Sequence, residues 1–358
     1  MSNNGISELL ARLSEAYGPS GYEDEVRKII IGEIRKFKGK PQVDSLGNVY
    51  AEIKGGGKGP RIMLSAHMDE VGFIIKYVED SGFLRFGNLG TIDPRVMPAQ
   101  RVLISGAKPI VGVIGSKPPH VLTPDEAKKA VEVGELYIDI GASSREEVNK
   151  LGIDVGTTGT FDVPFRHAAS GSMVVGKALD NRAGCAAALE LFESFSRKPP
   201  SPTVVFAFTV QEELGMRGAT VAASSAIPDV ALVFESAVAA DSPDVRPKDR
   251  ILIVGKGPAV RAMDNSMITQ RLMYEYMKKT AETHHIPYQI HINFGGATDA
   301  AKIHLSGKGI PTGVLSTPCR YLHSPSSMLD LQDLDNLLKL AEHTVRDIDS
   351  ADMFNYEA

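Results

Sequence analysis

Five places along the chain carry side chains that can bind a divalent metal ion. Three of them directly follow apolar runs that we predict to be buried strands, because 62–66 leads to His67, 204–210 to Glu212 and 231–234 to Glu235. In α/β sheets, ligands collect beyond the carboxyl ends of the strands, so we expect these side chains to meet at one edge of a sheet. The candidate residues are His67 with Asp69, Asp180, the pair Glu212 and Glu213, Glu235, and His323.

Taken one at a time, these residues have ordinary structural explanations. Asp180 can cap the helix that we predict to begin near Arg182, because Asp is a preferred N-cap residue. Adjacent glutamates such as Glu212 and Glu213 commonly form a solvated turn, and a single histidine after a strand is more often structural than a ligand. Their coincidence at several strand ends favours one shared site.

Together, these candidate residues suit a hydrolytic reaction. Two histidines and three carboxylates, one of them shared, suit a pair of Zn²⁺, Co²⁺ or Mn²⁺ ions. Two such ions about 3.5–4 Å apart can activate a shared water and stabilise the oxyanion that develops. A general base must stay off the metals, and the dipeptide Glu212–Glu213 can supply both a ligand and this base if the chain bends just after the strand. Asp69, two residues after His67, can accept a hydrogen bond from its ring and fix the tautomer.

The segments around these residues alternate between helix and strand. Their continuously apolar strands are typical of a sheet that is covered on both faces. We therefore predict a three-layer α/β/α domain with a mixed sheet. The helices are expected within 6–37 (two of them), 182–195, 267–283 and 330–348, and the strands at 48–53, 61–66, 203–210, 230–234, 251–254 and 311–315.

The segment 71–165 has a different texture. Short β-rich pieces are separated by Gly and Pro, and one charged stretch at 124–131 is expected to be helical. This pattern predicts a small β-barrel-like domain inserted into the larger one. The chain would then consist of a discontinuous catalytic domain, 1–70 with 166–358, and an inserted domain, 71–165.

Composition excludes several other classes of protein. The net charge of −5 comes with scattered Lys and Arg, so we expect no nucleic-acid and no membrane partner. The first 14 residues lack the pattern of a signal peptide, and no apolar run reaches the roughly 18 residues of a spanning helix. Cys185 and Cys319 lie far apart without C-x-x-C spacing, which favours a reducing compartment and predicts a cytoplasmic protein.

Several motifs resemble those of the glutamyl and deblocking aminopeptidases, a family that assembles as tetrahedral dodecamers. The resemblance covers essentially the whole chain, in order. The matching segments are GPSGYE (18–23), DSLGN (44–48), AHMDEVG (66–72), LDNRAG (179–184), VQEELG (210–215), GKGP (255–258) and RYLHSP (320–325).

The resemblance implies a two-metal aminopeptidase that hydrolyses N-terminal residues from short peptides. It implies that Asp180 bridges two divalent ions per subunit, Zn²⁺ or Co²⁺ with Mn²⁺ as a further option, and that the Asp180–Asn181 bond is cis. One ion would be held by His67 and Glu235 and the other by Glu213 and His323, with Glu212 as the base. It also implies that the inserted domain forms the dimer contact from which a homododecamer grows.

Two departures from the family pattern bear on function. The segment GGATDA (295–300) contains an extra Ala297, which leaves the role of Asp299 open between the site and helix capping. Glu235 occupies a position where many of these aminopeptidases carry Asp, whereas related two-metal carboxypeptidases and deacylases carry Glu. A carboxypeptidase or N-acyl amino acid hydrolase is therefore the alternative enzyme. A metal-stabilised assembly protein is the non-enzymatic alternative, which the presence of Glu212 disfavours.

Overall fold

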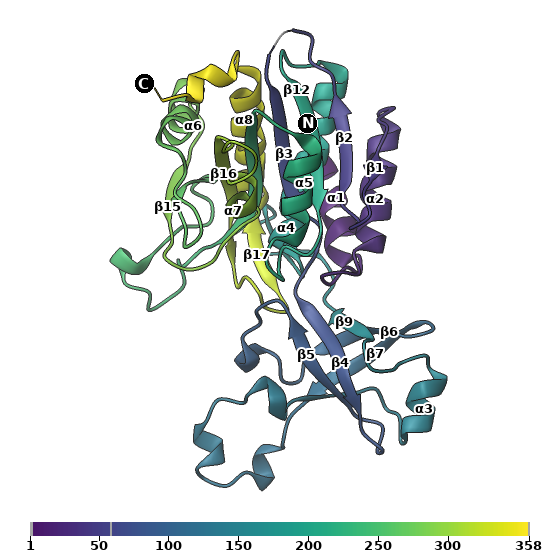
Figure 1. Ribbon diagram of the computed structural model, residues 1–358. Helices are drawn as coiled ribbons and strands as arrows, with labels where there is room; N and C mark the ends of the chain where they lie inside the picture. Colours follow the sequence, from purple (N-terminus) through teal and green to yellow (C-terminus); the bar gives the residue numbers. More distant parts are fainter. Residues whose placement is uncertain (1–2, 58, 357–358) are drawn as a thin grey trace.

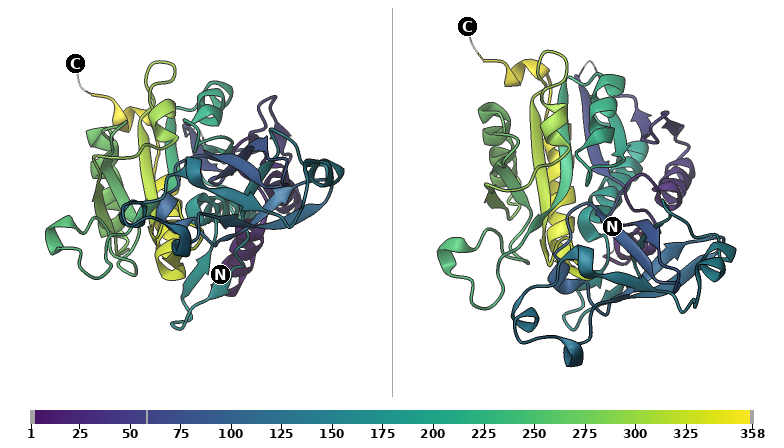
Figure 2. Two further views of the ribbon diagram at one scale, coloured as in Figure 1. Left: turned by 90° about the horizontal axis from the view of Figure 1, so that it is seen from below. Right: turned by 60° about the horizontal axis from the view of Figure 1, so that its bottom comes forward.

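The computed structural model describes residues 3–57 and 59–356 and has two parts. A large helix-and-sheet body lies at the top of Figure 1, and a barrel lies beneath it, joined where β3 (Arg61–His67) runs into β4 (Gly72–Val78). In Figure 2 the right-hand view shows the barrel below the body, and the left-hand view, from below, shows the barrel in front of it. The predicted fold class, an α/β body with a mixed sheet and an additional small barrel, is confirmed.

The large sheet has eleven strands and mixed directions. Its central strands β12, β3, β13 and β16 are parallel, so their carboxyl ends meet at one edge, next to the barrel. The order is β1 (Gln42–Val43), β2 (Val49–Ile53), β12 (Thr203–Thr209), β3, β13 (Val230–Val238), β16 (Thr312–Arg320), β17 (Ser327–Asp330), β11 (Met173–Gly176) and β10 (Arg166–His167). Off this path, β14 (Ala259–Met263) pairs with β16, and β15 (Gln289–Ile292) pairs with β14.

Helices cover both faces of this sheet. Successive residues of β3 show the division: Leu64 packs with the helices of one face, and Met63 packs with those of the other. The first face carries α1 (Asn3–Glu15), α2 (Asp24–Lys36), α4 (Leu179–Arg197), α6 (Arg271–Thr283) and α8 (Leu331–Arg346), and the second carries α5 (Arg217–Ala226) and α7 (Ala300–Ile303). Among the described residues, every helix is too short or too polar to cross a bilayer.

The barrel has its own core. Phe73 contacts Phe86 and Phe161 edge to face, with ring centroids 5.1 and 4.9 Å apart. Its strands close in the order β4, β5 (Leu84–Leu89), β8 (Tyr137–Asp139), β7 (Pro109–Gly115), β6 (Arg101–Ser105) and β9 (Thr158–Phe161), with α3 (Arg145–Lys150) outside. The short 3₁₀ turns are η1 (Pro94–Val96), η2 (Pro119–Val121), η3 (Glu126–Lys128), η4 (Val133–Glu135), η5 (Pro247–Asp249) and η6 (Ala351–Phe354).

Two expected elements are absent from the described residues. The charged stretch 124–131 forms only the single turn η3, because its side chains are exposed and bury no apolar face that would hold a helix. The expected strand 251–254 is irregular. There the amide of Ile253 donates to the side chain of Gln289 at 2.9 Å, and the next strand of the sheet, β14, begins only at Ala259.

Buried charges join the barrel to the sheet body. The Glu70 carboxylate lies between the two parts and accepts from Lys177 Nζ at 2.6 Å, from Arg182 Nη2 at 3.3 Å and from Thr160 Oγ1 of the barrel at 2.8 Å. All four residues are buried. Because an unpaired charge would be costly at this depth, the network holds the barrel beside the edge where β3 ends.

Candidate metal centre

Two clusters of possible metal ligands meet at the predicted sheet edge and share one carboxylate. In the first cluster, His67 Nε2 lies 3.5 Å from Asp180 Oδ1 and 3.5 Å from Glu235 Oε2. In the second, His323 Nε2 lies 3.5 Å from Asp180 Oδ2 and 3.3 Å from Glu213 Oε1. Asp180 therefore offers one oxygen to each cluster, which is the arrangement that a carboxylate bridging two ions requires.

Strand positions explain how these side chains meet. His67 is the last residue of β3, and Glu235 lies in the neighbouring β13, beyond the point where the pairing of these two strands ends. Asp180 precedes the regular part of α4 and has non-helical φ and ψ. The Asp180–Asn181 peptide bond is cis, as the resemblance implied. The Asn181 side-chain amide donates to the Phe234 carbonyl at 2.7 Å and so keeps Asp180 beside Glu235.

The chain bends sharply between β12 and α5, where the two adjacent glutamates lie. Gln211 has φ +55°, a left-handed conformation that is uncommon for residues other than glycine, and Gly215 follows with φ +109°. The bend separates the two side chains, because Glu213 enters the second ligand cluster whereas Glu212 belongs to neither cluster. Both nevertheless line the same cavity.

Asp69 connects this bend to the first histidine. Its carboxylate accepts the backbone N–H groups of Glu212 at 2.9 Å and Glu213 at 3.1 Å, and the Ser20 hydroxyl at 2.6 Å. One of its oxygens also lies 3.4 Å from His67 Nδ1. Burial alone would raise the pKa of Asp69, but the contacts with His67, Ser20 and the Glu212 amide lower it below its ordinary value.

The carboxylates gathered at this edge carry negative charge that bound cations would compensate. Burial, reinforced by neighbouring carboxylates, raises the pKa of Glu212, Glu213 and Glu235. The pKa of His323 rises to about 11, because contacts with Asp180 and Glu213 outweigh its burial. Buried oxygens of Asp180 and Glu235 have no hydrogen-bond partner within the described part of the chain. This donor set, with two histidines, three carboxylates and orphaned oxygens, fits a pair of divalent ions.

Asp299 lies close to this site but outside both clusters. It occupies the N-cap position of α7 without making a side-chain capping bond, and it accepts a hydrogen bond from the Thr209 hydroxyl instead. Burial and the charge of Glu235 raise its pKa to about 7. The capping explanation that the sequence left open is therefore not supported.

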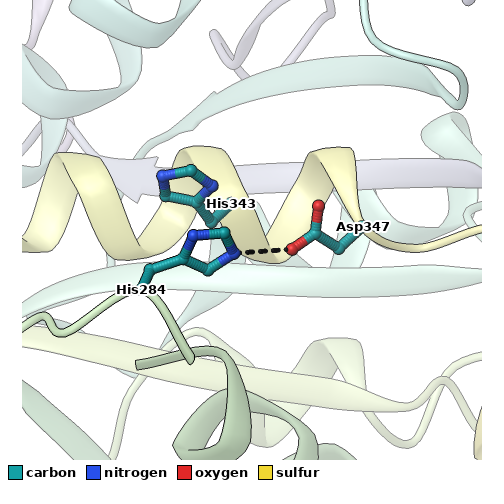
Figure 3. Close-up of side chains that lie close together, drawn as sticks. All are labelled: His284, His343 and Asp347. Atoms are coloured by element: carbon teal, nitrogen blue, oxygen red, sulfur yellow. Dashed lines mark hydrogen bonds and ion pairs between the residues drawn. The ribbon is translucent and has the colours of Figure 1, made fainter. Parts of the chain in front are cut away.

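A further cluster with suitable atoms lies away from the cleft, at the ends of α6 and α8 (Figure 3). His284 Nε2 contacts Asp347 Oδ2 at 3.0 Å, and the rings of His284 and His343 stack with centroids 3.5 Å apart and an interplanar angle of 17°. Lone pairs of imidazole nitrogens lie in the ring plane, so two stacked rings direct them side by side rather than toward one point. This geometry fits a surface hydrogen bond better than an ion site.

Sequence reasoning missed a polar group in the same cavity, which has a volume of about 310 Å³. Arg261 on β14 and His291 on β15 line it together with the proposed ligands. Their only sequence signal is a charged or polar residue inside a short apolar strand, as in AVRAM (259–263) and QIHI (289–292). Such a signal is weak until the neighbouring strand is known.

Comparison with known proteins identifies similar chains over nearly the full length. The family model described as M42 glutamyl aminopeptidase matches residues 47–340. A lysyl aminopeptidase of Pyrococcus furiosus is 31% identical, covering 96% of this chain and 98% of its own length. A glutamyl aminopeptidase of Lactococcus lactis is 30% identical, covering 90% of each.

Solved structures agree with these sequence relatives. A TET aminopeptidase from a marine sediment archaeon of the Thaumarchaeota is 38% identical with a TM-score of 0.93, over 97% of this chain and 98% of that one. The TET1 peptidase of Pyrococcus horikoshii, described as able to assemble into a tetrahedron or a large octahedral shell, is 35% identical with a TM-score of 0.85, over 96% and 99%.

Proposed function

Because the chain belongs to the M42 glutamyl aminopeptidase family, it is an aminopeptidase, and we propose that it trims short peptides with the aid of two divalent metal ions. The observation that carries the two-ion proposal is the sharing of Asp180, whose two oxygens face different histidines. His67 and Glu235 complete one ligand group, and Glu213 and His323 complete the other. Zn²⁺, Co²⁺ and Mn²⁺ all suit these nitrogen and oxygen donors.

Glu212 is the proposed general base. It lines the cavity without belonging to a ligand cluster, so its carboxylate is free to take a proton from the attacking water and pass it to the leaving amine. Bound ions would supply a water with a lowered pKa and a positive charge for the developing oxyanion. Asp69 is a positioning residue. Its backbone carbonyl lies at hydrogen-bond distance from His67 Nδ1, 3.2 Å, and its carboxylate lies 3.4 Å from the same nitrogen and holds the backbone of the Glu212–Glu213 bend.

The alternative interpretation, a carboxypeptidase or N-acyl amino acid hydrolase, was based on Glu235 at a position where many of these aminopeptidases carry Asp. Relatives that match nearly the whole chain are named as aminopeptidases, which argues against it. Glu235 nevertheless lies as near His67 as Asp180 does, 3.5 Å, so the longer side chain supports a ligand role. Catalysis also accounts for Glu212, which a metal-stabilised assembly protein would not need.

We further propose a cytoplasmic homo-oligomer built from dimers, with the insert 71–165 as the dimerisation domain and 1–70 with 166–358 as the catalytic domain. Val111 and Val113 project from β7 and are 53% and 43% exposed, which gives the barrel an apolar surface suited to a second copy. The described assembly of the Pyrococcus horikoshii protein supports a closed shell, with a dodecamer as the expected size. Buried free thiols at Cys185 and Cys319 suit a reducing compartment.

The proposal is tested with protein stripped of metal and then reloaded with Zn²⁺, Co²⁺ or Mn²⁺. Three forms of one short peptide are compared: unmodified, N-acetylated and C-amidated. We expect hydrolysis only after reloading, loss of cleavage on N-acetylation and little effect of C-amidation. Residues released from the C-terminus, or full activity in the stripped protein, would contradict the proposal.

A further inference from the structure

We propose that Glu23, in the segment GPSGYE (18–23), is a positioning residue that keeps Glu212 in place to act as the general base. This inference deepens the proposed function and rests on it, because Glu23 would act only through that base. No residue of the segment 18–23 belongs to a ligand cluster or lines the cavity. Its contribution to the site is therefore indirect, and the contacts of Glu23 show what it is.

All four backbone amides of the bend 210–213 donate to side chains that come from distant parts of the chain. The first amide donates to Asn48 Oδ1 at 3.0 Å and the second to Glu23 Oε1 at 3.1 Å. The third and fourth donate to the two carboxylate oxygens of Asp69, at 2.9 and 3.1 Å. Three separate segments therefore determine the path of the backbone at Glu212.

The bend needs this support because its backbone is strained. Gln211 has φ +55°, in the left-handed region. A residue other than glycine is strained in this region and persists there only where the surrounding structure holds it. Glu23 binds the amide of Gln211 itself, the residue directly before the proposed base. Loss of this contact would let the strained peptide unit relax and would turn the Glu212 side chain away from its position.

The Glu23 side chain has no closer alternative task. It is 1% exposed, and its Oε1 accepts from the Gly21 amide at 2.7 Å as well as from Gln211. Glu23 occupies the N-cap position of α2, yet its side chain makes no capping hydrogen bond there. Its other oxygen, Oε2, lies 3.9 Å from Arg27 Nη2, at the limit of an ion pair. Neither helix capping nor a close ion pair therefore accounts for a buried glutamate at this position.

Ser20 brings the same segment to the bend a second time. Its hydroxyl donates to Asp69 Oδ2 at 2.6 Å, the oxygen that also accepts the Glu213 amide. The Ser20 amide in turn donates to the Glu70 carbonyl at 3.3 Å, which fixes the segment beside the residues that follow β3. Glu23 thus holds the bend directly, and Ser20 holds it through Asp69.

The contact needs an acceptor oxygen from Glu23 rather than a negative charge. Burial, followed by the charge of Asp69, raises the pKa of Glu23 to about 7, so the neutral and charged forms coexist at neutral pH. Either form can accept the Gln211 amide, because a protonated carboxyl keeps acceptor capacity. A glutamine carboxamide has the same length and also offers a carbonyl oxygen. Glutamine should therefore replace Glu23, whereas a side chain without an oxygen should not.

The test uses the full chain loaded with whichever of Zn²⁺, Co²⁺ and Mn²⁺ gives the highest activity, and the aminoacyl p-nitroanilide that the wild type cleaves fastest. Glu23→Met has nearly the length of glutamate but no oxygen. We expect its kcat to fall about 10- to 100-fold, the scale expected when a reacting group is misplaced. KM and the number of bound ions should stay nearly unchanged, because Glu23 contacts neither the cavity nor the ligand clusters. Glu23→Gln should recover most of the loss in kcat.

A double substitution tests whether Glu23 acts through the base. The Glu212→Gln background has no base left to misplace, so adding Glu23→Met should lower kcat little further, whereas independent effects would multiply. Glu33→Ala, on the helix α2 that Glu23 precedes, is the control. Glu33 is also buried, but its partners Arg12 and Lys36 lie on α1 and α2 rather than at the bend, so its loss should leave kcat unchanged.

Four results would each overturn the proposal: near-normal turnover of Glu23→Met, an equal loss in Glu23→Gln, loss of a metal ion, or a full further loss in the Glu212→Gln background. If circular dichroism shows that Glu23→Met does not fold, Glu23→Ala replaces it. Failure of both variants to fold would assign Glu23 to stability and would overturn the proposal as well. A normal kcat in Glu212→Gln itself would instead count against the proposed base, on which this inference rests.

Discussion

Glu212 and Glu213 are adjacent and chemically identical, yet their surroundings predict different causes for the loss of activity on the same substitution. Glu213 Oε1 lies 3.3 Å from His323 Nε2 inside a ligand cluster, whereas Glu212 is in neither cluster. The backbone amides of both residues are held by Asp69 and are unaffected by a change from carboxylate to carboxamide. Glu212→Gln and Glu213→Gln therefore form a matched pair.

The expected size of each effect follows from these positions. Loss of a general base costs about 10²–10⁴ in rate, which corresponds to roughly 2.7–5.4 kcal/mol of transition-state stabilisation. Glu212→Gln should show this loss in kcat with both metal ions retained. Glu213→Gln leaves the second cluster with His323 and a shared Asp180, so one ion should be lost on dialysis.

The measurement combines metal analysis after gel filtration with kcat and KM for one aminoacyl reporter. Raising the metal concentration should restore part of the activity of Glu213→Gln, because weak binding can be overcome by mass action. It should not restore Glu212→Gln, whose defect is in proton transfer. Near-normal turnover of Glu212→Gln with both ions counted would remove this residue from the mechanism.

Three other outcomes are expected. Asp180→Ala should lose both ions on dialysis and His67→Ala mainly one, and two ions retained in Asp180→Ala would show that another residue bridges. Size-exclusion chromatography with light scattering should give a mass near that of a dodecamer, and an active monomer at micromolar concentration would refute the shell. Burial lowers the pKa of His291 from 6.5 to about 4. Between pH 6.5 and about 4, the unfolded chain therefore binds a proton at this residue that the folded chain does not. The free energy of unfolding should fall as the pH falls through this range, by up to about 3 kcal/mol. The urea midpoint of the wild type should drop across this pH range more steeply than that of His291→Gln. Equal drops in the two proteins would contradict a lowered pKa at His291.

Local sequence was sufficient to find the proposed ligands. His67 and Glu212 come directly after strongly apolar runs, and a strand buried on both faces is readable as such a run. Parallel strands deliver their last residues to one edge, so the convergence of these side chains could be predicted without knowing any contact. The bend at Glu212 and Glu213 was also predicted, because a continuing strand would point these two adjacent side chains to opposite faces.

Weakly patterned segments were not predictable in this way. The run 251–254 is apolar enough for a strand, yet it lies outside the sheet because β14, eight residues after its start, pairs with β16 instead. Conversely, β15 is only four residues long and half-exposed, so its own sequence carries little signal. Which of these segments joins the sheet is decided by pairing with distant strands.

The sequence by itself determined the α/β body, the inserted barrel and the identities of the residues that gather at the sheet edge, because each depends on periodicity and on the order of elements along the chain. Only the tertiary structure decided that Asp180 turns one oxygen toward His67 and the other toward His323. It also placed Arg261 beside His291, thirty positions along the chain, through the register of two short strands. Distances and register between strands depend on packing of the whole body, and no local pattern records them.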